Sequence, residues 1–243
     1  MRNNNRAAFQ MRDISFEVNF TKNAEGSCLV RIGNTWVLCT ASIDDKVPPF
    51  LKNKGQGWIT AEYSMLPRAT HERSAREIVK GKQAGRTLEI QRLISRSLRA
   101  AVNLELLGER NIIIDCDVLQ ADGGTRIAAI NGGYVALQIA LRSLNTAGLM
   151  HRIPIIRHIA GISCGMVNGE ILVDLDYLED SNADIDANFV YASDGKFVEV
   201  QFTGEKNTFD TETMMKMVEI AKNSCCDIIE KQKIAIASAI ENS

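Results

Sequence analysis

The sequence predicts an α+β fold in which two sheet-forming halves are each closed by helices. Strand-like segments rich in β-branched and aromatic residues occur in groups near both ends of the chain, and helix-like segments follow each group. The order of these segments does not repeat a parallel β-α unit. The chain has 243 residues, 45% of them hydrophobic and only four of them proline, and no segment has the composition of a linker. We therefore expect one domain that spans residues 1–243.

The first half is expected to contain an antiparallel sheet, a long loop and a helix. Residues 13–20 and 28–41 have the composition of strands, and Gly33-Asn34 within the second segment is a short-turn signal. Residues 42–85 include the basic run PRATHERSAREIVKGKQAG, which has no sustained apolar period, so we expect a long loop there. From Arg86 onward, apolar residues recur at i, i+3 and i+4, which predicts a helix. Three arginines fall away from its apolar stripe: Arg92, Arg96 and Arg99.

The middle of the chain predicts the order strand, helix, strand. Residues 111–119 (NIIIDCDVL) form an apolar run of strand length, and residues 127–147 have the length and composition of a helix. Residues 154–167 are expected to form a strand that is interrupted at the glycines of GISCG.

The last part of the chain predicts a small sheet and a closing helix. The segments EILVDLD, IDANFVYA and KFVEVQFTG favour a three-stranded meander, with Asp194-Gly195 as a hairpin turn and YLEDSNAD as an acidic loop between the first two strands. Asp210 or Thr211 can cap a final helix. Its apolar residues recur with helical spacing and are Met214, Met217, Val218, Ala221, Cys225, Ile228 and Ile229.

Composition excludes several classes of protein. The six cysteines lie mostly in apolar segments and none belongs to a Cys-x-x-Cys pair, so neither a zinc site nor a disulfide framework is indicated. The N-terminal residues lack the apolar core of a signal peptide, and no apolar run approaches the ~20 residues that span a bilayer. We therefore expect a cytoplasmic protein that makes no membrane contact.

The charges of the chain are separated along the sequence. A net charge of −2 argues against a surface coated in basic residues. However, residues 68–99 contain nine Lys or Arg against three Glu, whereas residues 170–186 contain seven carboxylates and no Lys or Arg. The first segment can attract a polyanion and the second a metal ion. The alternative is two solvated faces of opposite sign.

The stretch QADGGTR, residues 120–126, has the features of a phosphate-binding turn. It lies between a predicted strand and a predicted helix, where the first N–H groups of the helix are unpaired and the helix dipole favours an anion. Gly123 and Gly124 let the backbone approach a ligand, Thr125 adds a hydroxyl, and Arg126 offers a planar fork that matches phosphate oxygens. A plain loop with an exposed arginine is the alternative interpretation.

Two further groups of residues complete a possible site. Lys82 and Arg86 in GKQAGR stand at another predicted helix start, where the dipole disfavours cations, so a bound anion is indicated unless they merely cap the helix. Asp180 and Asp186 bracket the acidic loop and can share one Mg²⁺, which prefers one or two carboxylates together with waters and a phosphate. A solvated acidic loop is the alternative. The three histidines have no neighbours that indicate a Ser-His-Asp triad.

Four long segments resemble the bacterial ribonuclease PH family. They are FTKNAEGSCLVRIGNTWVLCTASI, FLKNKGQGWITAEYSMLPRATHERSAREIVKGKQAGRTLEIQRLISRSLRA, DCDVLQADGGTRIAAINGGYVAL and VDLDYLEDSNADIDANFV. The resemblance implies the ribosomal protein S5 domain 2-like fold. It also implies a phosphate-dependent 3′-to-5′ exoribonuclease that trims tRNA precursors, releases nucleoside 5′-diphosphates, can run in reverse as a nucleotidyltransferase, and takes part in rRNA maturation and decay.

The same resemblance assigns roles to the candidate residues. Inorganic phosphate, the co-substrate, is expected at Arg86, Gly124, Thr125 and Arg126. Asp180 and Asp186 are expected to be catalytic and to hold Mg²⁺, with Mn²⁺ as an alternative. Polynucleotide phosphorylase, a relative, has a lysine where this chain has Asn188, which puts a cation's role there in doubt.

The resemblance also implies an assembly and an RNA path. The family forms a homohexamer, a trimer of dimers, in which basic loops line the path of tRNA precursors and other RNA 3′ ends. The residues expected to contact RNA phosphates are Arg68, Arg73, Arg76, Arg92, Arg96 and Arg99. Two alternatives remain at this point: an RNA-binding ring subunit without activity, and a Mg²⁺-dependent hydrolase that uses water in place of phosphate.

Overall fold

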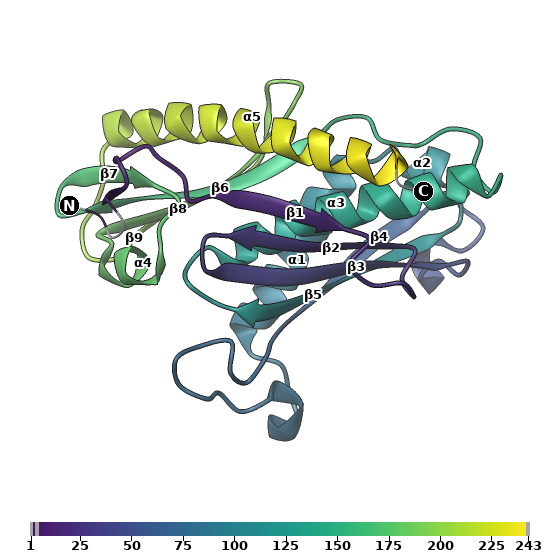
Figure 1. Ribbon diagram of the computed structural model, residues 1–243, viewed down its shortest axis with the longest axis horizontal. Coiled ribbons are helices and arrows are strands. Elements are labelled where there is room, and N and C mark those ends of the chain that lie inside the picture. The colour runs from purple at the N-terminus through teal and green to yellow at the C-terminus, as the bar shows by residue number, and fades with distance from the viewer. Residues whose placement is uncertain (1, 3–4, 242–243) are drawn as a thin grey trace.

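The computed structural model describes residue 2 and residues 5–241, which form two β-sheets joined by long helices (Figure 1). The first sheet has the strand order β1-β2-β3-β5-β4, with bounds β1 (Ile14–Val18), β2 (Gly26–Ile32), β3 (Thr35–Asp44), β4 (Trp58–Met65) and β5 (Asn111–Gln120). The second has the order β7-β6-β8-β9, with bounds β6 (Ile159–Val167), β7 (Glu170–Val173), β8 (Ile185–Ala192) and β9 (Phe197–Gly204). The α+β prediction is confirmed.

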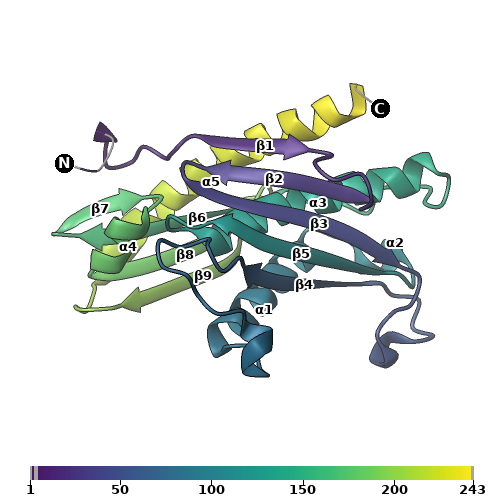
Figure 2. The same cartoon turned by 60° about the horizontal axis from the view of Figure 1, so that its bottom comes forward.

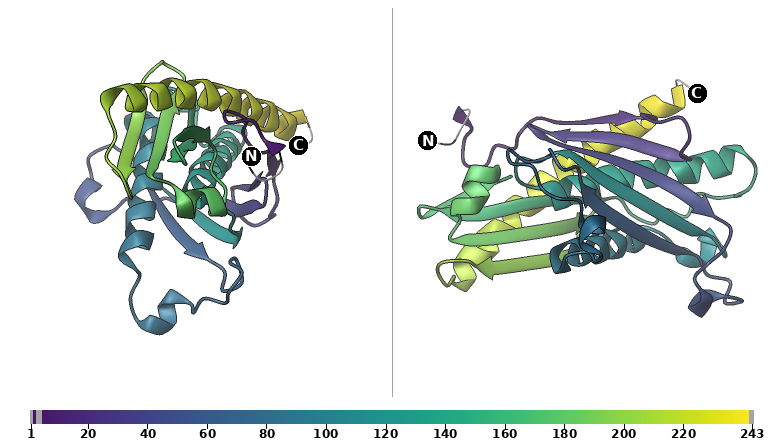
Figure 3. Two further views of the ribbon diagram at one scale, coloured as in Figure 1. Left: turned by 90° about the vertical axis from the view of Figure 1, so that its left-hand side faces the viewer. Right: turned by 90° about the horizontal axis from the view of Figure 1, so that it is seen from below.

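Helices cover both sheets and connect them. Their bounds are α1 (Gly85–Ala100), α2 (Leu104–Leu107), α3 (Thr125–Thr146), α4 (Tyr177–Asn182) and α5 (Thr211–Glu241), with short 3-10 turns η2 (Pro49–Leu51) and η3 (Glu77–Lys80). Helix α3 packs on β2 and β3 of the first sheet and on β6 of the second, while α1 packs on β4. Helix α5 contacts β6, β8, β1 and α3, and Figure 3 shows it running along both halves of the molecule.

The predicted hairpin of the first half is confirmed. Strands β2 and β3 pair antiparallel from Ile32↔Thr35 outward, and Gly33 has the positive φ of 53° that the tight turn requires. The predicted strand at 111–119 corresponds to β5, and the helix predicted from Arg86 corresponds to α1. Apolar residues at helical spacing, among them Ile90 and Leu98, are fully buried under the first sheet.

The prediction of one long loop over residues 42–85 is wrong, because strand β4 lies inside it. Its sequence WITAEYSM alternates strictly, and Ile59, Ala61 and Tyr63 point into the core. Strand β4 pairs parallel to β5 in the register Trp58↔Asn111, with a partner that arrives about fifty residues later in the chain. The segment between β4 and α1 remains a loop, apart from η3, and projects from the body of the molecule (Figures 1 and 2).

The second sheet differs from the predicted meander in three ways. Strand β6 lies between β7 and β8, so the first two predicted meander strands are not neighbours. Strand β6 begins at Ile159 rather than at residue 154, and its glycines do not interrupt it. A Cβ at Gly165 would stand 2.5 Å from Leu175 Cδ1, so this glycine allows close packing. The acidic loop is a short helix, α4, and β7 ends at Val173, before Asp174 and Asp176.

The predicted closing helix is confirmed and capped by Asp210. Its carboxylate Oδ1 accepts a hydrogen bond from Thr213 N at 2.7 Å, and α5 buries Met217, Ala221 and Cys225 against the second sheet. Five of the six cysteines are buried and Cys226 is exposed, all as free thiols.

Helix α3 corrects the expectation that no segment is apolar enough to span a membrane. By length and composition Thr125–Thr146 is such a helix, the one found among the described residues. However, 89% of its most apolar window is buried inside the fold. Helix α3 is therefore the shared core helix of the two halves.

Candidate active site

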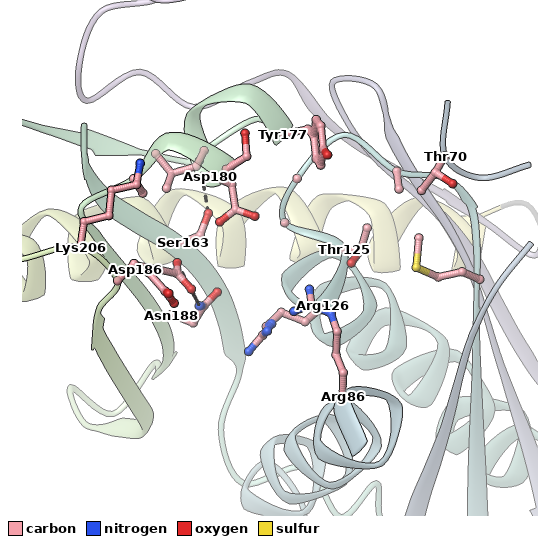
Figure 4. Close-up of a pocket in the computed structure, with 18 residues that line it drawn as sticks. Thr70, Arg86, Thr125, Arg126, Ser163, Tyr177, Asp180, Asp186, Asn188 and Lys206 are labelled. Atoms are coloured by element: carbon pink, nitrogen blue, oxygen red, sulfur yellow. Dashed lines mark hydrogen bonds between the residues drawn. The ribbon is translucent and has the colours of Figure 1, made fainter. Parts of the chain in front are cut away.

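The predicted site residues come together in one cavity between the two sheets. The cavity has a volume of about 470 Å³ and lies where α1, α3, α4 and β8 approach one another (Figure 4). Its lining includes all the predicted phosphate and metal residues, namely Arg86, Gly124, Thr125, Arg126, Asp180 and Asp186. Two helix N-termini thus face an acidic wall.

The glycine turn shapes one side of the cavity. Gly123 and Gly124 have φ angles of 73° and 68°, which glycine adopts without strain. A Cβ at Gly123 would lie 2.5 Å from Leu175 O, so the turn can sit directly against the segment that leads into α4 only because glycine is there. Thr125 begins α3, and its Oγ1 accepts a hydrogen bond from Tyr63 OH at 2.8 Å.

The two arginines differ in what holds them. Arg126 Nη1 lies 3.3 Å from Gln201 Oε1 and 3.6 Å from Glu89 Oε1, so its guanidinium is oriented by partners on β9 and α1. Arg86 makes no hydrogen bond or ion pair with any residue that the structure describes. Figure 4 shows the two guanidinium groups side by side, facing Asp180 and Asp186. Two converging cations at helix N-termini repel each other and the helix dipoles, and a bound anion relieves that repulsion.

The acidic wall consists of Asp180 on α4 and Asp186 on β8. Burial raises the pKa of both carboxyls, and the charge of Asp180 further raises that of Asp186, to about 6. The charges of Arg86 and Arg126 act in the opposite direction on Asp180. Asn188 Nδ2 donates to Asp186 Oδ2 at 3.1 Å, so the residue noted in the sequence orients this carboxylate rather than supplying a charge.

A buried ion network fixes α4 and therefore Asp180. Asp176 and Glu179 form a capping box at the N-terminus of α4. Burial opposes ionisation of Glu179, but hydrogen bonds from Arg2 and from the backbone of Asp176 lower its pKa on balance. Arg2 Nε lies 2.7 Å from Glu179 Oε1, and Arg6 Nη2 lies 3.1 Å from Oε2. The helix is thus held by charges from the N-terminal segment.

Arg12 connects the acidic segment to the glycine turn. Its Nε and Nη2 donate to Asp174 Oδ2 and Oδ1 at 2.9 and 2.7 Å, and its Nη1 donates to the carbonyl of Asp122. Asp174 is buried and has a φ of 54°, which turns the chain between β7 and α4. One guanidinium therefore ties together the two halves of the cavity wall.

The arginines predicted to contact RNA lie outside the cavity. Arg68, Arg73 and Arg76 are exposed on the loop between β4 and α1. Arg92 is exposed on α1. Arg96 pairs with Glu199 at 2.9 Å, and Arg99 donates to Ile59 O and stacks 4.3 Å above the Trp58 ring.

Several residues that line or support the cavity were not predicted. Glu205, just beyond β9, raises the pKa of both Asp180 and Asp186. Lys206 also lines the cavity and its Nζ donates to Asn182 O at 3.0 Å. Ser163 is the one hydroxyl residue of the apolar strand β6, and Tyr63 lies on the buried face of the alternating strand β4. A buried hydroxyl in a strand is the one signal that could have indicated them.

Comparison with known proteins identifies the family. The sequence profile of the 3′ exoribonuclease family matches residues 10–142 with its domain 1 and residues 158–224 with its domain 2. Ribonuclease PH from each of two strains of Cereibacter sphaeroides is 53% identical over 236 residues, which are 97% of this chain and 100% of each relative. The chain belongs to the ribonuclease PH family.

Membership of the ribonuclease PH family decides between the three activities that the sequence left open. The chain is a phosphorolytic 3′ exoribonuclease that trims tRNA precursors, a tRNA nucleotidyltransferase that uses inorganic phosphate as co-substrate. It is neither an inactive ring subunit nor a hydrolase.

Solved structures agree with the ribonuclease PH fold. Rice (Oryza sativa) Rrp46 superposes with a TM-score of 0.78 at 19% identity over 97% of this chain and 100% of that one. The Archaeoglobus fulgidus exosome with RNA bound to the active site gives 0.79 at 21% identity over 95% and 92%. The predicted S5 domain 2-like fold is confirmed.

Proposed function

We propose that the cavity between the sheets is the centre of phosphorolysis and that Arg86, Gly124, Thr125 and Arg126 bind the attacking phosphate. The observation that supports this most is the convergence of Arg86 and Arg126 from two helix N-termini, with Arg86 free of any described partner. Guanidinium groups match phosphate oxygens with two parallel hydrogen bonds, and the first N–H groups of α3 and the Thr125 hydroxyl add donors.

Asp180 and Asp186 suit a divalent cation. Burial and the charge of Asp180 raise the pKa of Asp186, so a cation between the two carboxylates removes an unfavourable interaction. The described residues hold no group of three His, Cys, Asp or Glu side chains that could bind a metal. Two carboxylates with waters and a phosphate are, however, the usual ligands of Mg²⁺, and Mn²⁺ is the alternative to test. When bound, the ion would neutralise the negative charge that builds up around the transferred phosphoryl group.

The chain's own residues position the reactants. A phosphate oxygen bonds to the phosphorus of the last phosphodiester while the bond from that phosphorus to the preceding 3′ oxygen breaks. The 3′ oxygen takes up the proton that the attacking phosphate gives up, and the terminal nucleotide leaves as a nucleoside 5′-diphosphate. Arg86 and Arg126 hold the phosphate and stabilise the charge of the transition state, and the Asp186 carboxylate accepts the proton of the attacking phosphate. Reversal of these steps adds a nucleotide.

The assembly and the RNA path extend this proposal. We place the protein in the cytoplasm as a homohexamer, a trimer of dimers, in which the loops bearing Arg68, Arg73 and Arg76 line the path of RNA, with Arg92, Arg96 and Arg99 on α1 beside it. Processing of rRNA 3′ ends would use the same site. Light scattering coupled to gel filtration should give six times the 26.8 kDa chain mass, and a smaller assembly would contradict the hexamer.

The decisive experiment uses a tRNA with a 3′ extension, with Mg²⁺ and with or without phosphate. We expect nucleoside diphosphates only when phosphate is present. Arg86→Ala should raise the KM for phosphate by roughly 10- to 150-fold, the value of a charge-assisted hydrogen bond, while RNA affinity changes little. Arg152→Ala, which removes an exposed arginine outside the cavity, is the control. An unchanged phosphate KM in Arg86→Ala would remove Arg86 from the site.

A further inference from the structure

Tyr177 has a fixed backbone at the edge of the cavity. It is the first residue of α4, directly after the capping residue Asp176. Its backbone N donates to Asp122 Oδ1 at 3.3 Å, and a Cβ on Gly123 would stand only 2.9 Å from that nitrogen. The phosphate-binding turn and the start of α4 are therefore in direct contact, and the ring of Tyr177 begins beside the residues that hold phosphate.

The side chain of Tyr177 has no structural role of its own. Its exposed fraction is 62%, and its hydroxyl makes no hydrogen bond with the described residues, although the ring lines the cavity. Figure 4 shows the ring on the rim formed by α4, across from Arg86 and on the same side as Asp180. Buried tyrosines pack a core and paired tyrosines hold a hydroxyl partner, and neither explanation applies here.

We propose that Tyr177 is a stacking platform for a base at the 3′ end of the RNA, at one of the two nucleotides that flank the scissile phosphate. The ring lies beside the phosphate-binding residues, and bases next to the reacting phosphorus must occupy the space along this rim. Aromatic stacking accepts any base, as an enzyme that removes successive nucleotides requires. The inference rests on the proposed location of the phosphorolytic centre.

The next residue of α4 provides a matched control. Leu178 has an exposed fraction of 57% but does not line the cavity. Leu178→Ala therefore removes a similar exposed side chain from the same short helix. Tyr177→Phe keeps the ring and removes the hydroxyl, so it separates stacking from hydrogen bonding.

The test measures steady-state phosphorolysis of a short oligonucleotide by the full chain. Tyr177→Ala should raise the KM for RNA by roughly 5- to 150-fold, the range for one base stacked on an aromatic ring, and leave the KM for phosphate unchanged. Tyr177→Phe should restore the RNA KM, and Leu178→Ala should match the parent protein. With an abasic nucleotide at the stacked position, the RNA KM of the parent protein should rise by the same factor. The RNA KM of Tyr177→Ala should not rise further on this oligonucleotide.

Two results would overturn the proposal. One is an RNA KM in Tyr177→Ala equal to that in Leu178→Ala, and the other is an equal penalty for Tyr177→Ala on normal and abasic oligonucleotides at both positions. A failure of the proposed centre looks different. In that case Arg86→Ala leaves the phosphate KM unchanged, whatever Tyr177→Ala does to the RNA KM.

Discussion

Asp186 is buried beside the charged carboxylate of Asp180. Its ionised form lowers the stability of the fold, but the proposed activity needs that form. Its carboxyl is more costly to ionise in the folded protein than in water, because burial and the charge of Asp180 oppose ionisation. A site that holds a cation needs the ionised form. The protein without a metal therefore retains an unfavourable interaction that the proposed cation would relieve, as is common where function and stability compete.

Asp186→Asn should stabilise the metal-free protein and abolish activity. The pKa of Asp186 rises from 3.8 to about 6 on folding, so the folded state binds the proton more tightly, and this contribution to stability is lost as pH rises between those values. At pH 7.5 in a chelator, the variant should be more stable to urea by about 1–3 kcal/mol. The parent should lose stability relative to the variant between pH 4 and pH 6.

Asp45→Asn is the control for this prediction because the Asp45 side chain is 94% exposed. It should change neither the stability nor its pH dependence. Equal urea stability of Asp186→Asn and the parent at pH 7.5 would show that Asp186 is ionised without cost.

The sequence singled out the six residues proposed to bind phosphate and metal, but not the fact that they line one cavity. The Gly-Gly-Thr-Arg turn and the arginine of GKQAGR each precede a helical pattern, so local sequence indicates an anion at each. Their convergence depends on the packing of α1 and α3 against one sheet, which no local pattern contains. Arg12 and Glu205 were missed for the same reason. Arg12 bonds to Asp174, more than a hundred positions away, and Glu205 acts on Asp186 of the neighbouring strand β8.

At the scale of elements, the sequence predicted those helices and hairpins whose signals lie within their own residues. Hairpin β2–β3 and helices α1 and α5 carry their turn, period or cap in their own residues. Strand β4 was missed although the alternation of WITAEYSM is a local signal, because it lies inside a segment that was interpreted as one loop. The pairing of β4 with β5 and of β6 with β8 could not be predicted, because pairing between non-consecutive strands leaves no mark in either segment. Helix α4 is too short to form alone. The ion network at its N-terminus provides the stability that so short a helix lacks.

Glu179→Gln tests whether this network positions α4. The substitution removes the carboxylate that pairs with buried Arg2 and one of the three carboxylates that pair with Arg6, so we expect a loss of about 3 kcal/mol in urea stability. Asp180 follows Glu179, so the Mg²⁺ concentration needed for half-maximal activity should rise. The phosphate KM should change little, because Arg86 and Arg126 stand on other helices.

The control is Glu212→Gln, which breaks the exposed pair with Lys216 on α5. It should cost no more than about 0.5 kcal/mol. If Glu179→Gln lowers stability but leaves the Mg²⁺ dependence unchanged, the network supports the fold alone and does not position Asp180.

The loop between β4 and α1 carries three exposed arginines that make no ion pair with any residue that the structure describes. Replacing Arg68, Arg73 and Arg76 together by Ala should weaken binding of a tRNA precursor more than turnover of a short oligonucleotide, because the number of phosphate contacts grows with RNA length. The slope of log affinity against log salt should fall by about 2 to 3.

A matched triple variant removes three exposed lysines from the other loop of the first sheet: Lys46, Lys52 and Lys54. It loses the same charge and should keep the parent's salt slope. Equal losses in the two triple variants would mean that net charge, and not this loop, attracts the RNA.

At the scale of the whole molecule, two long helices connect the two sequence domains of the family. Helix α3 packs on both sheets, and α5 contacts the second sheet, β1 and α3. Asn131 of α3 joins the halves directly: its Nδ2 donates to Gly161 O at 3.0 Å, and its Oδ1 accepts from Gly161 N at 2.8 Å. Gln232 of α5 reaches the same side chain at 3.4 Å. We infer that residues 1–243 fold as a single unit.

This inference predicts one unfolding transition, reported equally by two probes. The two tryptophans, Trp36 and Trp58, lie in the first sheet, whereas helical circular dichroism includes all 31 residues of α5. Urea midpoints from the two signals should coincide at a fixed protein concentration.

Asn131→Ala leaves both polar groups of Gly161 unpaired in the core and should lower stability by about 2–4 kcal/mol. Because Asn131 bonds a helix of the first half to a strand of the second, the two urea midpoints should fall together. A helical signal that is lost before tryptophan fluorescence changes would instead divide the chain at the boundary of its two family domains.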